Sequence, residues 1–317
     1  MLKRLRSECI VHLDITTDGP LLIKSGRTFA TGVDMTAVRT LRGGKWEVYI
    51  PGSSLKGAIR SQSERIARTL SSQGCCDPFG NHSCSEVLND FRNQNDSLPA
   101  ATAYRLSCAI CKLFGSLSQA GRLSFNDAHT NSRIDHKNLP IRNNVAINRR
   151  TGGAAGTALF DMEVVPTGTH FQTSFYLRNF ELWQLGLLGF VLRDFEEGTI
   201  KLGLGKSRGL GQVRANTTKL EVRYLGLYPQ PEPSSLCELR GLKNLEPDEP
   251  YGFAEENEPL PVYGNPAPPD AVGAIADEYG LRTIYRFESS SQLRHLWTKV
   301  APLWVAYIRS NRPPTEN

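Results

Sequence analysis

Prolines are concentrated in one part of the chain, and this limits how that part can fold. Ten of the 19 prolines lie between Pro229 and Pro269. A proline ring fixes φ and removes the backbone N–H, so a run of prolines opposes both helices and sheet ladders. We therefore expect residues 228–270 to be an acidic linker or an extended segment draped over the surface. This divides the chain into a domain of residues 1–227, the linker, and an extension of residues 271–317.

The balance of charge changes at the same boundary. The net charge is +5 overall, but residues 1–227 carry +10 and residues 228–288 carry −8. A basic domain followed by an acidic segment is typical of proteins that bind a polyanion such as nucleic acid. The alternative is an ordinary, mildly basic solvated surface, and charge alone does not separate the two.

Composition also limits where the protein works. The longest uncharged, apolar-rich run covers residues 182–192, whereas a membrane span needs about 20 residues. Seven cysteines, an odd number without an export signal, indicate a reducing compartment. We therefore expect a cytoplasmic protein with no membrane partner.

The pattern of apolar residues predicts alternating strands and helices. Strands are expected at residues 7–15, 121–128, 159–166, 170–178 and 211–225. A helix capped by Ser53 and Ser54 is expected over residues 55–70. A second helix is expected over residues 181–195, closed by Gly198. This order predicts an α+β fold with a ferredoxin-like core.

The extension is expected to be partly helical, with helices over residues 271–280 and 290–310. In the second of these, apolar residues recur at three- and four-residue steps. Such a stripe is more often a packing face than a ligand site. It could contact the domain or a partner subunit.

A glycine-rich run, residues 201–214, combines small residues with cations. Its glycines let the backbone approach a phosphate closely, and Lys206 and Arg208 add positive charge. A P-loop would need glycine at Ile200, and a dinucleotide fingerprint needs two rather than three residues between its second and third glycines. ATPase and dehydrogenase functions are therefore disfavoured. An ordinary glycine-rich hairpin loop is the alternative to a phosphate site.

The start of the helix at residues 55–70 is a second phosphate-compatible site. The sequence PGSSLKGAIR places two hydroxyls and Lys56 there, and Arg60 follows about one turn later. A helix N-terminus favours an anion because its N–H groups are unpaired and its dipole is positive there. Serine at this position is also an ordinary helix cap.

The cysteines are clustered, with five of the seven between Cys75 and Cys111. This density, together with a C-x-x-C pair, favours one tetrahedral, structural zinc ion bound by thiolates. The ligands predicted first are Cys76, Cys84, Cys108 and Cys111, with Cys75 or His82 as substitutes. Buried free thiols or a redox pair are the alternatives. Zinc would hold an insertion of residues 74–111 that could not otherwise form a core.

Catalytic motifs are sparse. The carboxylate of interest is Asp34, in a loop that also carries the cations Arg27 and Arg39. An aspartate beside an RNA phosphate could coordinate a divalent ion or orient the 2′-hydroxyl for in-line attack. An aspartate in a turn is more often structural.

Several segments, in this order, resemble the RAMP (repeat-associated mysterious protein) superfamily: IPGSSLKGAIRS, CAICKLFGS, GRLSFNDA, TALFDMEVVPTGTHF and GLGKSRGLGQV. They are most similar to the backbone subunit of type III CRISPR effector complexes. The resemblance covers residues 1–227. It implies a modified RRM-like core that polymerises along a guide RNA.

The resemblance also implies roles for individual residues. Guide contacts are implied for Ser53, Ser54, Lys56, Arg60, Gly203, Gly205, Lys206, Ser207, Arg208 and Gly209. Residues 143–160 correspond to a thumb hairpin that interrupts the guide–target duplex. In this hairpin Ile147 offers an apolar wedge, and Arg149 and Arg150 offer charge.

In the same family, a loop aspartate similar to Asp34 is required for metal-dependent cleavage of target RNA, which implies Mg²⁺ or Mn²⁺ as cofactor. Arg27 and Arg39 lie beside it and are expected to contact RNA. The C-x-x-C before KLFG is similar to the family's zinc-binding region. Three features depart from the family: Thr36 replaces the usual proline, 23 residues separate Cys84 from Cys108, and the extension has no counterpart.

The leading hypothesis is a subunit that binds guide RNA and cleaves complementary target RNA through Asp34, as an endoribonuclease within the assembled complex. Its partners would be other RAMP backbone subunits and the large and small subunits. A structural RNA-binding subunit without cleavage is the second hypothesis. A metal-independent guide-processing endoribonuclease is the third, with His12, His129 and His136 as candidates. A small-molecule phosphate enzyme comes last.

Overall fold

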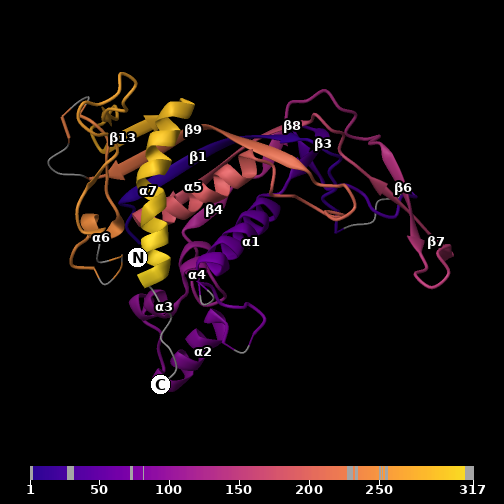
Figure 1. Cartoon of the computed structure of the whole chain (residues 1–317), viewed down its shortest axis with the longest axis horizontal. Helices are drawn as coiled ribbons and strands as arrows, with labels where there is room; N and C mark the ends of the chain where they lie inside the picture. Colours follow the sequence, from indigo (N-terminus) through magenta and orange to yellow (C-terminus); the bar gives the residue numbers. More distant parts are fainter. Residues whose placement is uncertain are drawn as a thin grey trace.

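The computed structural model describes residues 3–26, 32–71, 74–80, 82–226, 231–232, 235–249, 251, 253 and 256–310. The chain is an α+β protein in which helices lie against an antiparallel sheet (Figure 1). The α+β class predicted from the sequence is therefore confirmed, while the ferredoxin-like arrangement of the core stays a prediction. The predicted site residue Arg27 lies outside the described residues.

The elements follow one another in this order. The first part contains β1 (Ser7–Thr17), β2 (Arg39–Arg42), β3 (Lys45–Ile50), α1 (Gly52–Leu70), α2 (Cys84–Asn95), α3 (Ala100–Leu106), α4 (Ala109–Phe114), β4 (Leu123–Phe125) and β5 (Ala128–Thr130). The middle contains β6 (Ile141–Ile147), β7 (Ala154–Glu163), β8 (His170–Arg178), α5 (Leu182–Glu196) and β9 (Val213–Leu225). The last part contains β10 (Glu238–Leu239), α6 (Leu242–Leu245), β11 (Leu260–Pro261), β12 (Ile275–Ala276), β13 (Arg282–Phe287) and α7 (Ser290–Ser310).

The main sheet has the strand order β12-β13-β9-β1-β8-β5-β3-β2, and β4 also pairs with β8. Its central strand, β1, pairs antiparallel with both β8 and β9. Side chains alternate between the two faces of a strand, so the apolar positions from Cys9 to Ile15 enter the core on one face. The strand predicted at residues 7–15 is therefore confirmed.

Helices α1 and α5 lie against this sheet, and α7 packs along α5 (Figure 1). Eleven of the fifteen residues of α5 are buried. A helix that is apolar around its whole circumference must be covered on every side. The sheet covers one side of α5 and α7 covers another, so the helix predicted at residues 290–310 forms, and its apolar stripe packs on the domain.

The contact between α5 and α7 is close because glycines lie at it. A Cβ built on Gly186 would stand 2.3 Å from the carbonyl oxygen of Val300. The Trp183 ring stacks on the Tyr307 ring with centroids 3.9 Å apart, and on the Trp304 ring at 5.8 Å. Aromatic stacking of this kind adds to the gain from burial.

The helix predicted over residues 271–280 is wrong. These residues contain the short strand β12, which pairs with β13, and β13 continues the sheet beside β9. In β13, Thr283, Tyr285 and Phe287 are buried and alternate with more exposed residues, which is strand periodicity. The Asp277 carboxylate accepts the backbone N–H groups of Leu281 and Arg282 and stabilises the turn between the two strands.

The acidic, proline-rich segment is anchored to the domain rather than free as a linker. Its strands β10 and β11 pair with each other, and Cys237, Leu239 and Val262 join the core. The buried Glu256 carboxylate accepts the backbone N–H groups of Leu182, at 2.6 Å, and of Trp183, at 2.7 Å. These are first-turn amides of α5, which have no partner inside the helix. The division of the chain into domain, linker and extension stays a prediction.

Two predicted strands differ in extent. The stretch 121–128 forms two short strands, β4 and β5, that both pair with β8. Of the strand predicted at 159–166, residues 159–163 belong to β7, which begins earlier, at Ala154, and pairs with β6 in a separate two-stranded sheet. No helix in the described part of the chain is long and apolar enough to cross a membrane.

The close approach at Gly186 predicts a stability effect. In Gly186→Ala the added methyl group would meet the Val300 carbonyl, so we expect the free energy of unfolding to fall by about 1–3 kcal/mol. Gly57 in α1 has open space around its Cβ position, so Gly57→Ala should raise it by about 0.5–1 kcal/mol. Denaturant unfolding of both variants is the measurement. An equal effect in both would contradict the packing of α7 on α5.

Candidate nucleic-acid interface and metal centre

Helix α1 begins one residue before the predicted serines, so the prediction that they cap it is wrong. Pro51 is the N-cap, and no side chain makes a cap hydrogen bond. A Cβ at Gly52 would stand 2.6 Å from the Phe125 carbonyl oxygen, which explains why glycine opens the helix. The backbone N–H of Gly52 donates to Asp127 Oδ1 at 2.7 Å. The hydroxyl of Ser53 is at an exposed position in the first turn.

The two cations that follow on α1 have different surroundings. Arg60 donates to Glu64 at 3.0 Å, to the Gly115 carbonyl at 3.1 Å and to Cys111 Sγ at 3.6 Å. Lys56 is half-buried, and burial, followed by the charge of Arg60, lowers the pKa of its amine. No ion pair to Lys56 occurs among the described residues. Of these two cations, Lys56 is therefore the one whose amine is available to bind an anion.

The glycine-rich loop is fixed at its ends and exposed at its tip. Gly203 and Gly211 have φ of +73° and +80°, and a Cβ on Gly203 would stand 2.1 Å from the Leu22 carbonyl oxygen. Leu204 N donates to that same oxygen at 2.8 Å. Only glycine adopts such a conformation at this approach without strain. The residues at the tip, predicted to bind RNA, are all exposed: Lys206, Ser207, Arg208 and Gly209.

The loop of Asp34 is docked on β7. Asp34 is exposed, and its Oδ2 accepts the backbone N–H of Asp161 at 3.0 Å. Met35 N donates to the Asp161 carbonyl at 3.1 Å, and Glu163 N donates to the Met35 carbonyl at 2.9 Å. Oδ2 of Asp34 is thus held at a defined place, and no hydrogen bond to its Oδ1 occurs among the described residues.

Arg39 fixes this loop from inside the protein. Its guanidinium lies 2.7 Å from Glu163 Oε2, and the two side chains are 8% and 5% exposed. The same carboxylate oxygen accepts Ala37 N at 3.0 Å, and Arg39 Nε donates to the His136 carbonyl at 2.7 Å. The structure therefore places Arg39 as a support for the Asp34 loop. Glu163 is a site residue that the sequence does not predict; its signal is a pair of carboxylates, Asp161 and Glu163, in a strand of otherwise uncharged residues.

Strands β6 and β7 form a hairpin that projects from the body of the molecule (Figure 1). Ile147 is 56% exposed at the end of β6, and Arg149 and Arg150 are exposed in the turn that follows. Asn148 Oδ1 accepts Arg150 N at 2.9 Å, which stabilises this turn. The residues predicted for the thumb are therefore together at the tip of the hairpin.

Three motifs that are distant in the sequence meet at the base of this hairpin. Phe160 of β7 is adjacent to Asp161, which binds the Asp34 loop. The Arg208 guanidinium of the glycine-rich loop lies 5.8 Å from the centre of the Phe160 ring, a cation–π contact. The base of the thumb thus contacts both the Asp34 loop and Arg208.

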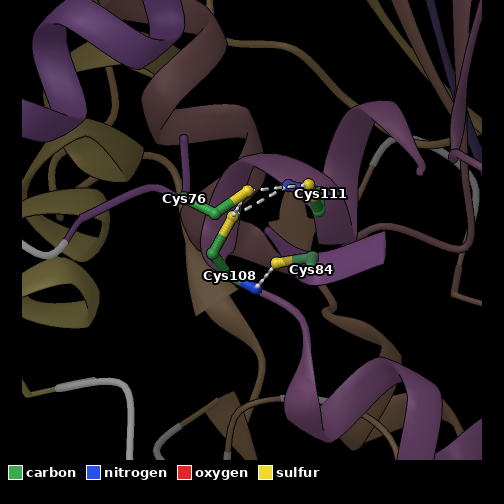
Figure 2. A group of neighbouring side chains, drawn as sticks. All are labelled: Cys76, Cys84, Cys108 and Cys111. Carbon is green, nitrogen blue, oxygen red and sulfur yellow. Dashed lines mark hydrogen bonds between the residues drawn. The ribbon is translucent and has the colours of Figure 1, made fainter. Parts of the chain in front are cut away.

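The sulfur atoms of Cys76, Cys84, Cys108 and Cys111 all lie within 4.8 Å of one another (Figure 2). Cys84 begins α2, Cys108 is the N-cap of α4, and Cys111 follows in α4. The sulfur of Cys76 is 3.7 Å from that of Cys111 and 3.8 Å from that of Cys108. In a tetrahedron with Zn–S bonds of about 2.3 Å, sulfur atoms lie about 3.8 Å apart. These four cysteines could therefore hold a metal ion such as zinc.

The surroundings of the cluster suit thiolate ligands. Cys84 Sγ accepts the Cys108 N–H at 3.2 Å, and Cys108 Sγ accepts the Cys111 N–H at 3.4 Å. Hydrogen bonds with Cys111, Cys76 and Cys84 lower the pKa of the Cys108 thiol, whereas hydrogen bonds with Cys108 raise the pKa of the Cys84 and Cys111 thiols. The predicted substitutes, Cys75 and His82, do not belong to this group of four.

Comparison with known proteins was made on this background. The family model of the RAMP superfamily matches residues 14–214, which is more than half of the chain. The matched range includes Asp34, the residues predicted to contact RNA and the four cysteines. No curated protein matches the chain with significance. The family match indicates a CRISPR-associated role that involves RNA binding.

The cysteine cluster predicts a specific loss of metal. We expect the purified protein to contain one zinc ion per chain, and Cys108→Ser to lose it together with part of its thermal stability, because three thiolates bind zinc less tightly. Cys75→Ser is the matched control, since Cys75 neighbours Cys76 in the sequence but lies outside the group of four. Zinc is measured by elemental analysis. Full zinc content in Cys108→Ser would contradict this assignment.

Proposed function

We propose that this chain, which belongs to the RAMP superfamily, is a backbone subunit of a type III CRISPR effector complex that binds guide RNA and cleaves complementary target RNA. The observation that carries the proposal is the meeting of Asp34, Arg208 and the thumb at one place. Further RAMP backbone subunits and the large and small subunits of such a complex would be its partners.

Guide binding is supported by cations and amides at exposed positions. The tip of the glycine-rich loop offers Lys206 and Arg208, and the first turn of α1 offers Ser53 and Lys56. Helix N-termini and turns rich in glycine hold phosphate groups through backbone N–H donors. Asp127 already accepts the first amide of α1, so the phosphate is expected at the serine hydroxyls and Lys56. The domain's charge of +10 favours the same ligand.

The thumb is suited to a paired RNA. Ile147 at its tip could wedge between bases, while Arg149 and Arg150 contact the phosphates on either side. A hairpin that enters the duplex exposes one nucleotide of the target at the thumb base. That is where the structure places Asp34.

Asp34 supports cleavage through its free carboxylate oxygen. The Asp161 N–H fixes Oδ2, which leaves Oδ1 to orient the 2′-hydroxyl for in-line attack on the adjacent phosphate. A divalent cation such as Mg²⁺ or Mn²⁺ would be held by this oxygen together with phosphate oxygens of the RNA, and it would supply Lewis-acid stabilisation of the phosphate. The buried pair of Arg39 and Glu163 keeps the loop in place.

A second candidate function is favoured by a cluster at β3 and β5. His129 Nδ1 lies 2.5 Å from Glu47 Oε1, and the His129 ring stacks on the Tyr49 ring with centroids 6.0 Å apart. A histidine, a carboxylate and a tyrosine together could act as acid and base in RNA cleavage without metal. Cleavage that persists in EDTA and is abolished by His129→Ala would favour this function.

Substitution of Asp34 is the direct test of cleavage. We expect Asp34→Ala to abolish Mg²⁺-dependent cleavage of complementary RNA by the assembled complex and to leave guide binding unchanged, because Asp34 is not among the residues expected to contact the guide. Asp90→Ala, at an exposed position of α2, is the matched control. The cleavage rate and the guide affinity are measured separately. Unchanged cleavage in Asp34→Ala, with cleavage lost in EDTA, would show that the subunit cleaves RNA with a metal ion but that Asp34 is not its catalytic residue.

The thumb arginines predict a change in salt dependence. In Arg149→Ala/Arg150→Ala, we expect weaker RNA binding, and the slope of log affinity against log salt should become shallower by about 0.7 for each lost phosphate contact. Arg294→Ala is the matched control, since Arg294 is exposed on α7, far along the chain from the thumb. Affinities over a salt series are the measurement. Equal slopes for the two variants would show that Arg149 and Arg150 do not contact RNA phosphates.

A further inference from the structure

A groove of about 830 Å³ lies between α1 and the cysteine-bearing segment. Its floor includes Lys56 and Arg60 of α1, and its walls come from the turn at residues 77–80 and the turn at residues 115–121. Cys84 and Cys111 of the metal cluster are also part of its lining. The groove is continuous with the first turn of α1, because Lys56 belongs to both.

Each wall of the groove carries a large apolar side chain that nothing in the described structure covers. Phe79 is 96% exposed and Leu117 is 94% exposed. Exposed apolar residues that stand singly are common on protein surfaces, but two that flank one groove mark a binding surface. An exposed phenylalanine beside a cation is the composition of sites that stack the bases of single-stranded nucleic acid.

The lining also contains polar side chains. Gln119 Oε1 accepts the Ser107 hydroxyl at 2.7 Å, while Gln119 Nε2 is buried and has no hydrogen-bond partner among the described residues. This amide nitrogen is shielded from the groove, and the hydrogen bond of Gln119 to Ser107 holds the turn at residues 115–121. Glu86 is the acidic residue of the lining, opposed by the two cations of the floor.

We propose that this groove binds one nucleotide of single-stranded RNA, with its base stacked on Phe79 and its phosphate at Lys56. The inference deepens the proposed function and rests on it, since both require that the chain binds RNA. RNA is favoured over a protein partner because the floor is cationic and joins the phosphate-compatible turn of α1. Leu117 closes the side of the groove opposite Phe79 by apolar contact.

The test compares variants of the full-length protein in binding a labelled single-stranded RNA of mixed sequence. We expect Phe79→Ala to weaken binding about tenfold, which corresponds to about 1.4 kcal/mol and falls within the range for one base stacked on an aromatic ring. The salt dependence should stay unchanged, because no phosphate contact is lost. Phe79→Trp should bind as the unaltered protein does. Tyr279→Ala is the matched control, since Tyr279 is 78% exposed in the extension.

Zinc content is measured for every variant, so that a disturbed cysteine cluster is recognised. If Phe79→Ala binds RNA like the unaltered protein while Arg149→Ala/Arg150→Ala binds more weakly, the groove is not an RNA site and the proposed function stands. If Phe79→Ala changes self-association in sedimentation but not RNA affinity, the groove is a protein contact and the inference is overturned. If the unaltered protein binds no RNA, the proposed function fails together with this inference.

Discussion

The structure depends on one helix that has no polar face to turn toward water. The residues of α5 are apolar around its circumference, and burial on all sides is the only stable arrangement for such a helix. The sheet covers one side of α5 and α7 covers another. Gly186 permits the close approach of α7, because a Cβ at this position would collide with Val300. Glu256, from the acidic segment, binds the first-turn amides of α5. Described residues of the acidic segment, of β13 and of α7 therefore join the core of the domain.

A buried ion pair extends this arrangement toward the cysteine cluster. Arg122 Nη1 lies 3.0 Å from Glu181 Oε1, directly before α5, and Tyr104 of α3 donates to the same carboxylate. Trp183 Nε1 donates to its other oxygen at 2.6 Å. Removing one partner of the buried pair costs about 3–5 kcal/mol, and the Tyr104 hydrogen bond ties α3 to the residue before α5. The cysteine-bearing segment and the groove beside it are thereby attached to the core, which a nucleotide site with fixed walls requires.

The candidate site was predictable where its chemistry is local. The spacing of four cysteines indicated the same set that the structure brings together, and glycines next to Lys206 indicated an exposed cationic loop. The contacts that hold the site residues in place were not predictable from the sequence. The N–H that holds Asp34 comes from Asp161, 127 residues later, and Arg39 binds Glu163, 124 residues later. No local pattern distinguishes a cation that pairs with a carboxylate inside the protein from one at the surface. The position of Arg39 beside Asp34 therefore predicts an RNA contact rather than this ion pair.

The sequence by itself determined the α+β class, the strand at β1, the helices α1, α5 and α7, and the identity of the four clustered cysteines. These features follow from residue periodicity and spacing, which act over a few residues. Only the tertiary structure decided that residues 275–287 extend the sheet, that the proline-rich segment is anchored by Glu256, and that Asp34, Arg208 and the thumb meet. These features depend on pairing between distant segments, and a strand with a few residues is fixed by its neighbour in the sheet rather than by its own sequence.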